Sequence, residues 1–170
     1  EYNMNLNKRK AIYIPFPQAV PSTYLIDKEN CLFFKKEICK ICEKFCEIKA
    51  IDYEQADEHI NLNVGAIVLS LGAETFDPSV LPQYGYGKFK NVVTSMEFER
   101  ILNASGPFKG EVLRPSDNKH PKKVMWINCI GSRNTKINKG YCSSVCCTYT
   151  IKQAVIAKEH APDLDCSIFF

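Results

Sequence analysis

The sequence predicts an α/β fold, and three observations lead to that prediction. Residues 123–129 read as a buried strand, and a polar loop, a helix to about 160 and a second strand at 164–170 follow them. The apolar run at 64–72 is typical of a strand that is buried on both faces of a parallel sheet. Eight of the nine cysteines fall into two groups of four, which indicates metal centres built into this fold.

The N-terminal part of the chain reads as short extended pieces around the first cysteines. Residues 11–15 and 24–26 are predicted to be short strands, because their apolar and aromatic side chains are bounded by turn residues. The cysteines that follow are expected in a loop at about 31–50. Residues 60–64 alternate apolar and polar side chains, as a strand does, and lead into the run at 64–72.

A helix and a candidate boundary precede the second set of cysteines. Residues 95–103 read as a helix with acidic residues in its first turn. Its apolar side chains near one face are Met96, Phe98 and Leu102. Residues 104–120 are rich in glycine, proline, serine and aspartate, so this segment is the candidate boundary between two parts of the chain.

Composition and charge exclude several classes of protein. The 170 residues are 45% hydrophobic and 24% charged, as in an ordinary globular chain. A net charge of +3 is too small for a dedicated nucleic-acid binder. The longest apolar stretch is about half of the roughly 20 residues that a transmembrane helix needs. No secretory signal is readable, and because the first residue is Glu1 rather than Met we expect a piece of a longer protein.

The first cysteine group favours an iron–sulfur cluster. Its members are Cys31, Cys39, Cys42 and Cys46. Zinc sites usually pair two short knuckles about a dozen or more residues apart, whereas a four-iron cluster takes one thiolate on each iron from a wrapping loop. The group keeps two spacings of the bacterial ferredoxin run, but its first gap is longer and Glu47 stands where proline would. Zinc and plain buried thiols are the alternatives.

The second cysteine group lies at the turn of the predicted β-loop-α-β unit. Its members are Cys129, Cys142, Cys146 and Cys147. A dinucleotide-binding unit carries G-x-G-x-x-G in this turn, but here a thiol replaces the first glycine and the motif is broken. Thiols one helical turn apart can converge on the strand end, where the helix dipole favours thiolates. A second cluster is therefore favoured, with a vicinal-thiol redox site or buried thiols as the alternatives.

Other residues near this turn carry smaller predictions. Ser143 or Ser144 is expected to cap the helix. Arg133 either neutralises charge at the site or is an ordinary loop residue. Cys166 lies in the final strand and is expected to be a small core residue. The three histidines have no partner at a telling spacing, so no hydrolase triad is predicted.

Several of these segments resemble HdrA, the flavin-containing iron–sulfur component of heterodisulfide reductase. They are Lys8–Pro21, the loop Cys31–Cys46, Asn91–Arg100 and the stretch Cys129–Gln153 with its Cys-Cys pair. The resemblance covers nearly the whole chain and corresponds to an internal region of HdrA. It implies a thioredoxin-reductase-like flavoprotein fold with two dinucleotide-binding domains and a ferredoxin-like cysteine loop inserted.

The resemblance implies a role for each part of the chain. Residues 1–119 would belong to an FAD-binding domain with the iron–sulfur insertion at about 31–50. Residues 120–170 would be the first half of a degenerate Rossmann-like domain of NAD(P) type that carries the second cluster. The implied cofactors are two [4Fe–4S] clusters, ligated by the two cysteine groups, and FAD. The glycine-rich FAD fingerprint that such proteins carry earlier is absent from this sequence.

The resemblance also implies contacts to the flavin. Two-domain flavoproteins often end a strand with Ala-Thr-Gly close to FAD, and Ser70, Leu71 and Gly72 stand at that place here. Lys152 falls where the family places a lysine near the flavin, and a cation there would stabilise the reduced, anionic form. Gln18 is a further candidate for a polar contact. The alternatives are an ordinary turn glycine and a solvated helix lysine.

The function that the resemblance implies is electron transfer between FAD and the clusters in a multi-subunit complex. Some members of the family split the electron pair of the flavin between two acceptors. The implied partners are other subunits of the complex, which can itself form a homodimer, and no nucleic acid. Because exposed clusters survive poorly elsewhere, the cytoplasm is expected. Two other classes stay open: a zinc-stabilised interaction module, and a dithiol–disulfide oxidoreductase that uses Cys146 and Cys147.

Overall fold

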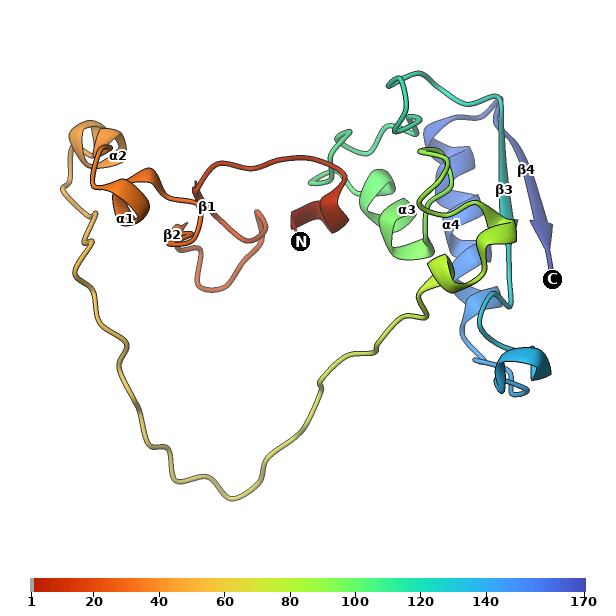
Figure 1. Cartoon of the computed structure of the whole chain (residues 1–170), viewed down its shortest axis with the longest axis horizontal. Coiled ribbons are helices and arrows are strands. Elements are labelled where there is room, and N and C mark those ends of the chain that lie inside the picture. The colour runs from red at the N-terminus through yellow and green to blue at the C-terminus, as the bar shows by residue number, and fades with distance from the viewer. Residues whose placement is uncertain (1) are drawn as a thin grey trace. The chain divides into compact units, whose positions relative to one another are not determined.

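Residues 2–170, which a computed structural model describes, divide into two compact units (Figure 1). The smaller unit is Arg9–Glu74, and the larger unit combines Thr75–Phe170 with the segment before Arg9. The candidate boundary at 104–120 therefore lies inside the larger unit. The described chain contains both α-helices and β-strands, so the prediction of an α/β protein is confirmed.

The smaller unit contains a hairpin and two short helices. β1 (Ile12–Tyr13) and β2 (Leu25–Ile26) pair antiparallel, which confirms both predicted strands, although they are shorter than expected. α1 (Leu32–Lys36) and α2 (Ile41–Phe45) follow. The predicted cysteine loop at 31–50 therefore contains two helices of five residues each, and these fix the backbone that carries the first cysteine group.

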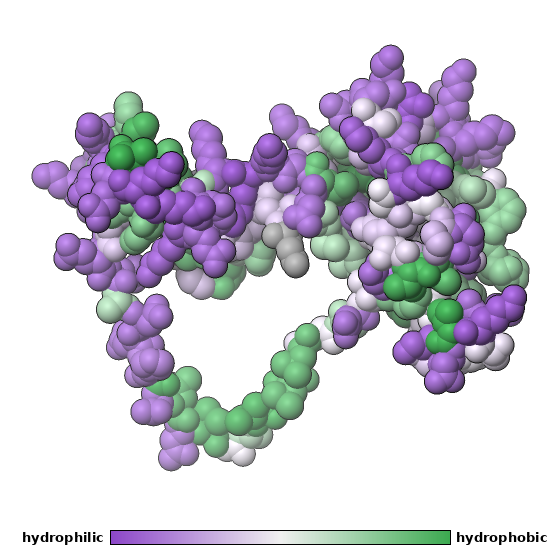
Figure 2. All heavy atoms as spheres, in the orientation of Figure 1, coloured by the Kyte–Doolittle hydropathy of each residue, from purple (hydrophilic) through white to green (hydrophobic). Residues whose placement is uncertain are grey.

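The predicted strand at 64–72 is not formed, and neither is the one at 60–64. Both segments lack helix and strand, and the apolar side chains are exposed, Val68 to 88% and Leu71 to 89%. Figure 2 shows an almost continuous hydrophobic stretch along this extended segment. A buried strand needs neighbouring strands at its edges and cover on its faces. Within residues 2–170, the structure pairs only β1 with β2 and β3 with β4, so this run has no strand partner.

The larger unit contains the predicted β-loop-α-β arrangement. β3 (Lys123–Ile127) leads through a loop to α4 (Cys146–His160), and β4 (Asp165–Phe169) returns beside β3 (Figure 1). The two strands are parallel, with Trp126 opposite Ile168. The order and the parallel pairing confirm the predicted unit, but the expectation of a buried strand is wrong, because Met125 is 60% and Ile127 45% exposed. The remaining short turns of the described chain are the 3-10 helices η1 (Tyr2–Asn5), η2 (Pro78–Val80), η3 (Pro82–Tyr84) and η4 (Thr135–Ile137).

The helix predicted at 95–103 is α3 (Ser95–Leu102), and it begins with a capping box. The Thr94 hydroxyl accepts a hydrogen bond from the Glu97 N–H at 3.2 Å, and the Glu97 carboxylate accepts one from the Thr94 N–H. The buried residues of the helix are Phe98, Ile101 and Leu102. Met96 was predicted on this face but is 45% exposed, because two residues along a helix turn a side chain to the opposite side.

The core of the larger unit lies between α3, α4 and the sheet. Its members are Phe98, Ile101, Leu102, Val112, Trp126, Ala157 and Leu164. The ring of Trp126 meets the ring of Phe98 edge on, with 5.4 Å between centroids. Each large side chain buried in this way contributes roughly 1.5–3 kcal/mol. Cys166 packs partly buried against this core, as predicted. The packing holds the first turn of α4 close to the end of β3.

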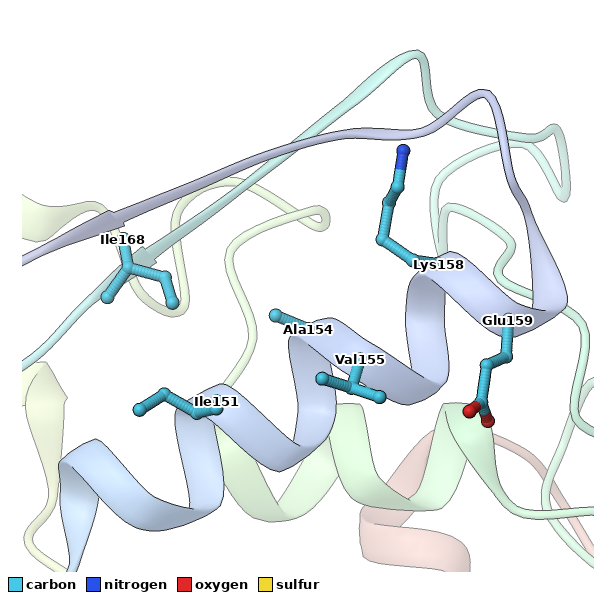
Figure 3. Close-up of a pocket in the computed structure, with 6 residues that line it drawn as sticks. All are labelled: Ile151, Ala154, Val155, Lys158, Glu159 and Ile168. Carbon is cyan, nitrogen blue, oxygen red and sulfur yellow. The ribbon is translucent and has the colours of Figure 1, made fainter.

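One face of α4 is left open and apolar. Ile151 and Val155 are each more than half exposed, and Ile168 of β4 lies over the same face. Figure 3 shows the residues that line the hollow there: Ile151, Ala154, Val155, Lys158, Glu159 and Ile168. The longest helix among residues 2–170 is α4, with 15 residues, and no helix of this part of the chain is long and apolar enough to span a bilayer.

Candidate metal centres and flavin contacts

The second cysteine group gathers where β3 ends and α4 begins. Cys129 follows the strand with a left-handed backbone, φ +61°. Cys146 opens the helix and interacts with both Cys129 and Cys147. The charge of Cys142 also acts on Cys147. The four thiols that the sequence grouped together therefore lie within electrostatic reach of one another.

Ionisation of these thiols is mutually dependent. Burial disfavours the Cys146 thiolate, but hydrogen bonds from Ser143 and from Cys129 and Cys147 outweigh it and lower the pKa of Cys146. The pKa of Cys147 is raised, first by burial and then by the negative charge of Cys146. Thiolates this close repel one another, and a bound cationic centre would relieve that repulsion.

The predicted serine cap of α4 is wrong, because neither serine occupies the position before the helix. The residue before the helix is Val145, which makes no side-chain cap. Ser144 has a left-handed backbone, φ +60°, whereas a capping residue is extended. Its N–H donates to the Cys142 sulfur at 3.3 Å, and the Ser143 hydroxyl reaches Cys146. Ser144 therefore contacts the cysteine group through its backbone and Ser143 through its side chain, and neither caps the helix.

Two further side chains point polar hydrogens at this group. Arg133 Nη1 lies 3.8 Å from the Cys129 sulfur. Of the two roles predicted for Arg133, this contact favours the neutralisation of negative charge at the site. Asn128 Nδ2 lies 4.0 Å from the Cys147 sulfur, and its Oδ1 accepts a hydrogen bond from the buried Thr150 hydroxyl at 2.8 Å. Sequence reasoning missed Asn128. The signal in the sequence that could have identified Asn128 was its polar side chain at the end of an otherwise apolar strand.

The turn after β3 is filled by an aromatic ring. Gly131 has a left-handed backbone, φ +82°, and a Cβ atom on it would clash with the ring of Phe76. In a dinucleotide-binding unit the glycine backbone of this turn approaches a pyrophosphate. Phe76 covers that place here, which agrees with the broken glycine motif in the sequence.

The first cysteine group is arranged around α1 and α2. Cys31 is buried directly before α1, Cys42 lies in α2, and Cys46 is the C-cap of α2. Cys39 lies between the two helices. The Ala50 N–H donates to the Cys46 sulfur at 3.2 Å. Sulfur atoms in both groups therefore accept hydrogen bonds from fixed polar groups, as cluster ligands commonly do.

Tyr53 is a member of the first site that sequence reasoning missed. Its hydroxyl oxygen lies 2.9 Å from the Cys42 sulfur. This contact first, and burial second, raise the pKa of Tyr53 above the ordinary value of a phenol. The sequence placed Tyr53 eleven residues away from Cys42, in a segment with no pattern of its own. The nearest signal in the sequence was the pair Phe33 and Phe34, because Tyr53 packs against both of these rings.

The donor set fits an iron–sulfur cluster in its chemistry. Each group offers four thiols, and hydrogen-bond donors reach sulfur atoms in both groups. Within residues 2–170, no group of three or more cysteine, histidine, aspartate or glutamate side chains is arranged to hold one metal ion. A four-iron cluster makes a different demand, because each of its irons takes one thiolate and the ligands surround a cubane.

The residues predicted to contact flavin are distributed over both units. In the smaller unit, Gly72 has φ +77° with open space around it, and Ser70, Leu71 and Gln18 are exposed. The strand end that was expected to present Gly72 is not formed, so these contacts stay predictions. Lys152 lies in α4 of the larger unit.

Lys152 is ion-paired rather than freely solvated. Its ammonium pairs with Glu99 of α3. Burial alone would raise the pKa of Glu99, but hydrogen bonds from Lys152 and Gln153 outweigh it and lower that pKa. The carboxylate therefore stays ionised and holds the lysine side chain in place. Gln153 was missed in the sequence, where only its polarity on an apolar helix face marked it.

Comparison with known proteins gives high identities over the whole chain. The sequence is 44% identical over 170 residues to the iron–sulfur HdrA component of CoB–CoM heterodisulfide reductase from Methanocaldococcus jannaschii, covering 100% of this chain and 25% of that protein. It is 46% identical over 168 residues to the first of two corresponding components in Methanopyrus kandleri, covering 97% of this chain and 25% of that protein. Over its whole length the chain is therefore similar to the HdrA proteins of heterodisulfide reductase.

A third HdrA protein shows the same similarity. The HdrA component of the H(2):CoB-CoM heterodisulfide,ferredoxin reductase of Methanothermobacter marburgensis is 43% identical over 169 residues, covering 99% of this chain and 25% of that protein. No family model matches the sequence. The chain spans about a quarter of the length of these relatives. The resemblance drawn from the cysteine motifs is thereby confirmed.

Proposed function

We propose that this chain holds two iron–sulfur clusters in an electron-transfer component of heterodisulfide reductase type. The observation that carries the proposal is the set of polar groups in hydrogen-bond contact with sulfur atoms of both cysteine groups. The Methanocaldococcus jannaschii relative is named an iron-sulfur protein of the reductase. When bound, [4Fe–4S] clusters supply one-electron transfer.

In this proposal some residues of the chain ligate the clusters and others adjust the reduction potentials of the clusters. The first cluster would be ligated by Cys31, Cys39, Cys42 and Cys46, and the second by Cys129, Cys142, Cys146 and Cys147. Hydrogen bonds to ligand sulfurs raise the reduction potential of a cluster, because they favour the form that carries more negative charge. Arg133 beside Cys129 would act in the same direction through its positive charge.

The proposal extends to FAD within a two-dinucleotide-binding flavoprotein fold. Gly72 leaves its backbone open to close approach, because its φ is +77° and nothing lies within 4 Å of a Cβ built there. Ser70, Leu71 and Gln18 would lie along the same cofactor. Lys152, fixed by Glu99, would place a cation where it favours negative charge on a flavin.

The same proposal includes the setting in which electrons move. The Methanothermobacter marburgensis relative is named as a reductase of both a heterodisulfide and ferredoxin. Two acceptors of this kind are what division of an electron pair at a flavin would require. The proposed partners are therefore other subunits of a reductase complex in the cytoplasm, with a dimer of that complex as a larger assembly.

The test is the content of iron, zinc and acid-labile sulfide in anaerobically purified protein, with a visible spectrum of the same sample. Two clusters predict iron and sulfide in equal amounts, about four of each per cluster, and broad charge-transfer absorption. About one zinc per cysteine group without sulfide would make the chain a structural module instead. Reactive thiols without any metal would favour the dithiol oxidoreductase.

A further inference from the structure

We infer that Tyr53 sets the reduction potential of the first cluster by donating a hydrogen bond to the sulfur of Cys42. The inference rests on the proposed function, because it takes Cys42 as a cluster ligand. The hydroxyl oxygen of Tyr53 and the sulfur of Cys42 are 2.9 Å apart. Nothing in the relatives' names or in the cysteine spacing assigns a role to this tyrosine.

The direction of the hydrogen bond follows from ligation. Between a free thiol and a phenol, either group can donate. A cysteine sulfur bonded to iron has lost its proton, so it can only accept. The Tyr53 hydroxyl is then the donor to Cys42, and a hydrogen bond to a charged acceptor is stronger than one between neutral groups.

The ring of Tyr53 is held by packing. It lies against Phe33 with 4.2 Å between centroids and meets Phe34 edge on at 5.8 Å. The ammonium of Lys40 lies 5.6 Å from the Tyr53 ring and 4.9 Å from the Phe33 ring. These contacts come from α1 and the residue before α2, so the hydroxyl is fixed relative to the helix that carries Cys42.

A fixed donor at a ligand sulfur acts on the redox equilibrium. A cluster held by the first cysteine group would take up one electron from an external reductant, passing from its 2+ to its 1+ state, and the added charge would be shared by iron and sulfur. The hydrogen bond to Cys42 stabilises this reduced state more than the oxidised state, so it raises the potential, and no proton leaves Tyr53. The contact of Ala50 with Cys46 uses a backbone N–H, which makes Tyr53 the donor that a substitution can remove.

The experiment compares Tyr53→Phe with the unsubstituted full-length protein in an anaerobic titration with dithionite, followed by EPR. Phenylalanine keeps the ring contacts and removes only the hydroxyl. We expect iron content to be unchanged and the reduction equilibrium of the first cluster to shift about tenfold toward the oxidised state, which is about 59 mV for one electron. Tyr24→Phe is the matched control, because Tyr24 lies in the same unit and is 68% exposed.

Three outcomes separate this inference from the function on which it rests. If Tyr53→Phe keeps its iron and its first cluster has the same reduction potential as in the Tyr24→Phe control, the role of Tyr53 is overturned. The cluster assignment is then still intact. Iron content that Cys42→Ala leaves unchanged overturns the cluster assignment itself. If Tyr53→Phe loses iron, the unsubstituted protein is measured in deuterated buffer. The inference requires an exchangeable proton coupled to the reduced first cluster in addition to the Ala50 N–H, and the absence of this second proton refutes the inference.

Discussion

The buried amide of Gln153 accepts a hydrogen bond from the indole N–H of Trp126 at 3.2 Å. The same amide donates to the Ser95 carbonyl at 2.9 Å and to the Glu99 carboxylate at 3.2 Å. Gln153 is only 2% exposed. One polar side chain therefore joins β3, α4 and the start of α3, next to the lysine proposed to face the flavin.

Replacing this amide should destabilise the larger unit. Gln153→Leu would leave the buried indole N–H of Trp126 without its acceptor, and an unsatisfied buried polar group costs about 1–3 kcal/mol. We expect a loss of that size in the free energy of unfolding, measured by urea denaturation. Gln83→Leu is the control, since Gln83 is exposed and its loss should change the midpoint little. Equal midpoints for the two variants would contradict the account of Gln153.

Adding a single methyl group to the turn after β3 should strongly destabilise the protein. In Gly131→Ala the new Cβ would meet the ring of Phe76, and the residue would also have to keep a positive φ. Gly87→Ala imposes the positive φ alone, because φ is +77° there and nothing lies within 4 Å. The control should cost about 1 kcal/mol and Gly131→Ala about 1–3 kcal/mol more.

Thermal unfolding of both glycine variants, with iron content, measures this difference. Because Gly131 lies two residues after Cys129, disturbing this turn should displace that thiol, so Gly131→Ala should lose iron from the second group while Gly87→Ala keeps it. Similar melting temperatures and iron contents in the two variants would show that Phe76 does not close the turn.

The ion pair of Glu99 with Lys152 predicts a specific pH dependence. The pKa of Glu99 is lowered from its ordinary value of 4.5, in opposition to burial, by hydrogen bonds from Lys152 and Gln153. A lowered carboxyl pKa in the folded state stabilises the protein above pH 4.5 and stops doing so as the pH falls through the folded value. Because the pair is partly exposed, we expect no more than about 1 kcal/mol.

Urea unfolding of metal-free protein between pH 3 and 7 checks this prediction without interference from acid loss of clusters. Glu99→Gln should be less stable than the parent at neutral pH, and the difference should shrink below pH 4.5. Lys152→Met should remove part of the same dependence. A difference that stays constant across this range would mean that the ion pair does not stabilise the fold.

Sequence patterns predicted the elements whose stabilising contacts are local. The β-loop-α-β unit was readable because its strands and helix follow one another and a parallel pair needs a crossover of this kind. The helix α3 was readable from its first turn and its apolar period. The predicted end of α4 was correct, but the predicted serine cap was wrong, because Val145 precedes the helix and Ser144 has a left-handed backbone.

The sequence was less informative where the partners are distant. The run at 64–72 reads as a buried strand, yet a strand is only formed when other strands pair with it, and residues 2–170 supply none. The first cysteine group was predicted from spacing and the second mainly from its place at the turn of the β-loop-α-β unit, and the ligation of a cluster by either group stays a prediction. Tyr53 and Gln153 could not be found in this way, since each acts through contacts that only the packed chain brings together.

The most direct test of the account is the iron and sulfide lost when single cysteines are replaced. Cys147→Ala and Cys42→Ala should each remove one cluster, about four irons with matching sulfide, relative to the parent protein. Cys166→Ala is the matched control, because this partly buried thiol belongs to the core and to neither group, and its iron content should equal that of the parent. Unchanged iron in Cys147→Ala, or equal losses in all three variants, would contradict the assignment of two clusters to these two groups.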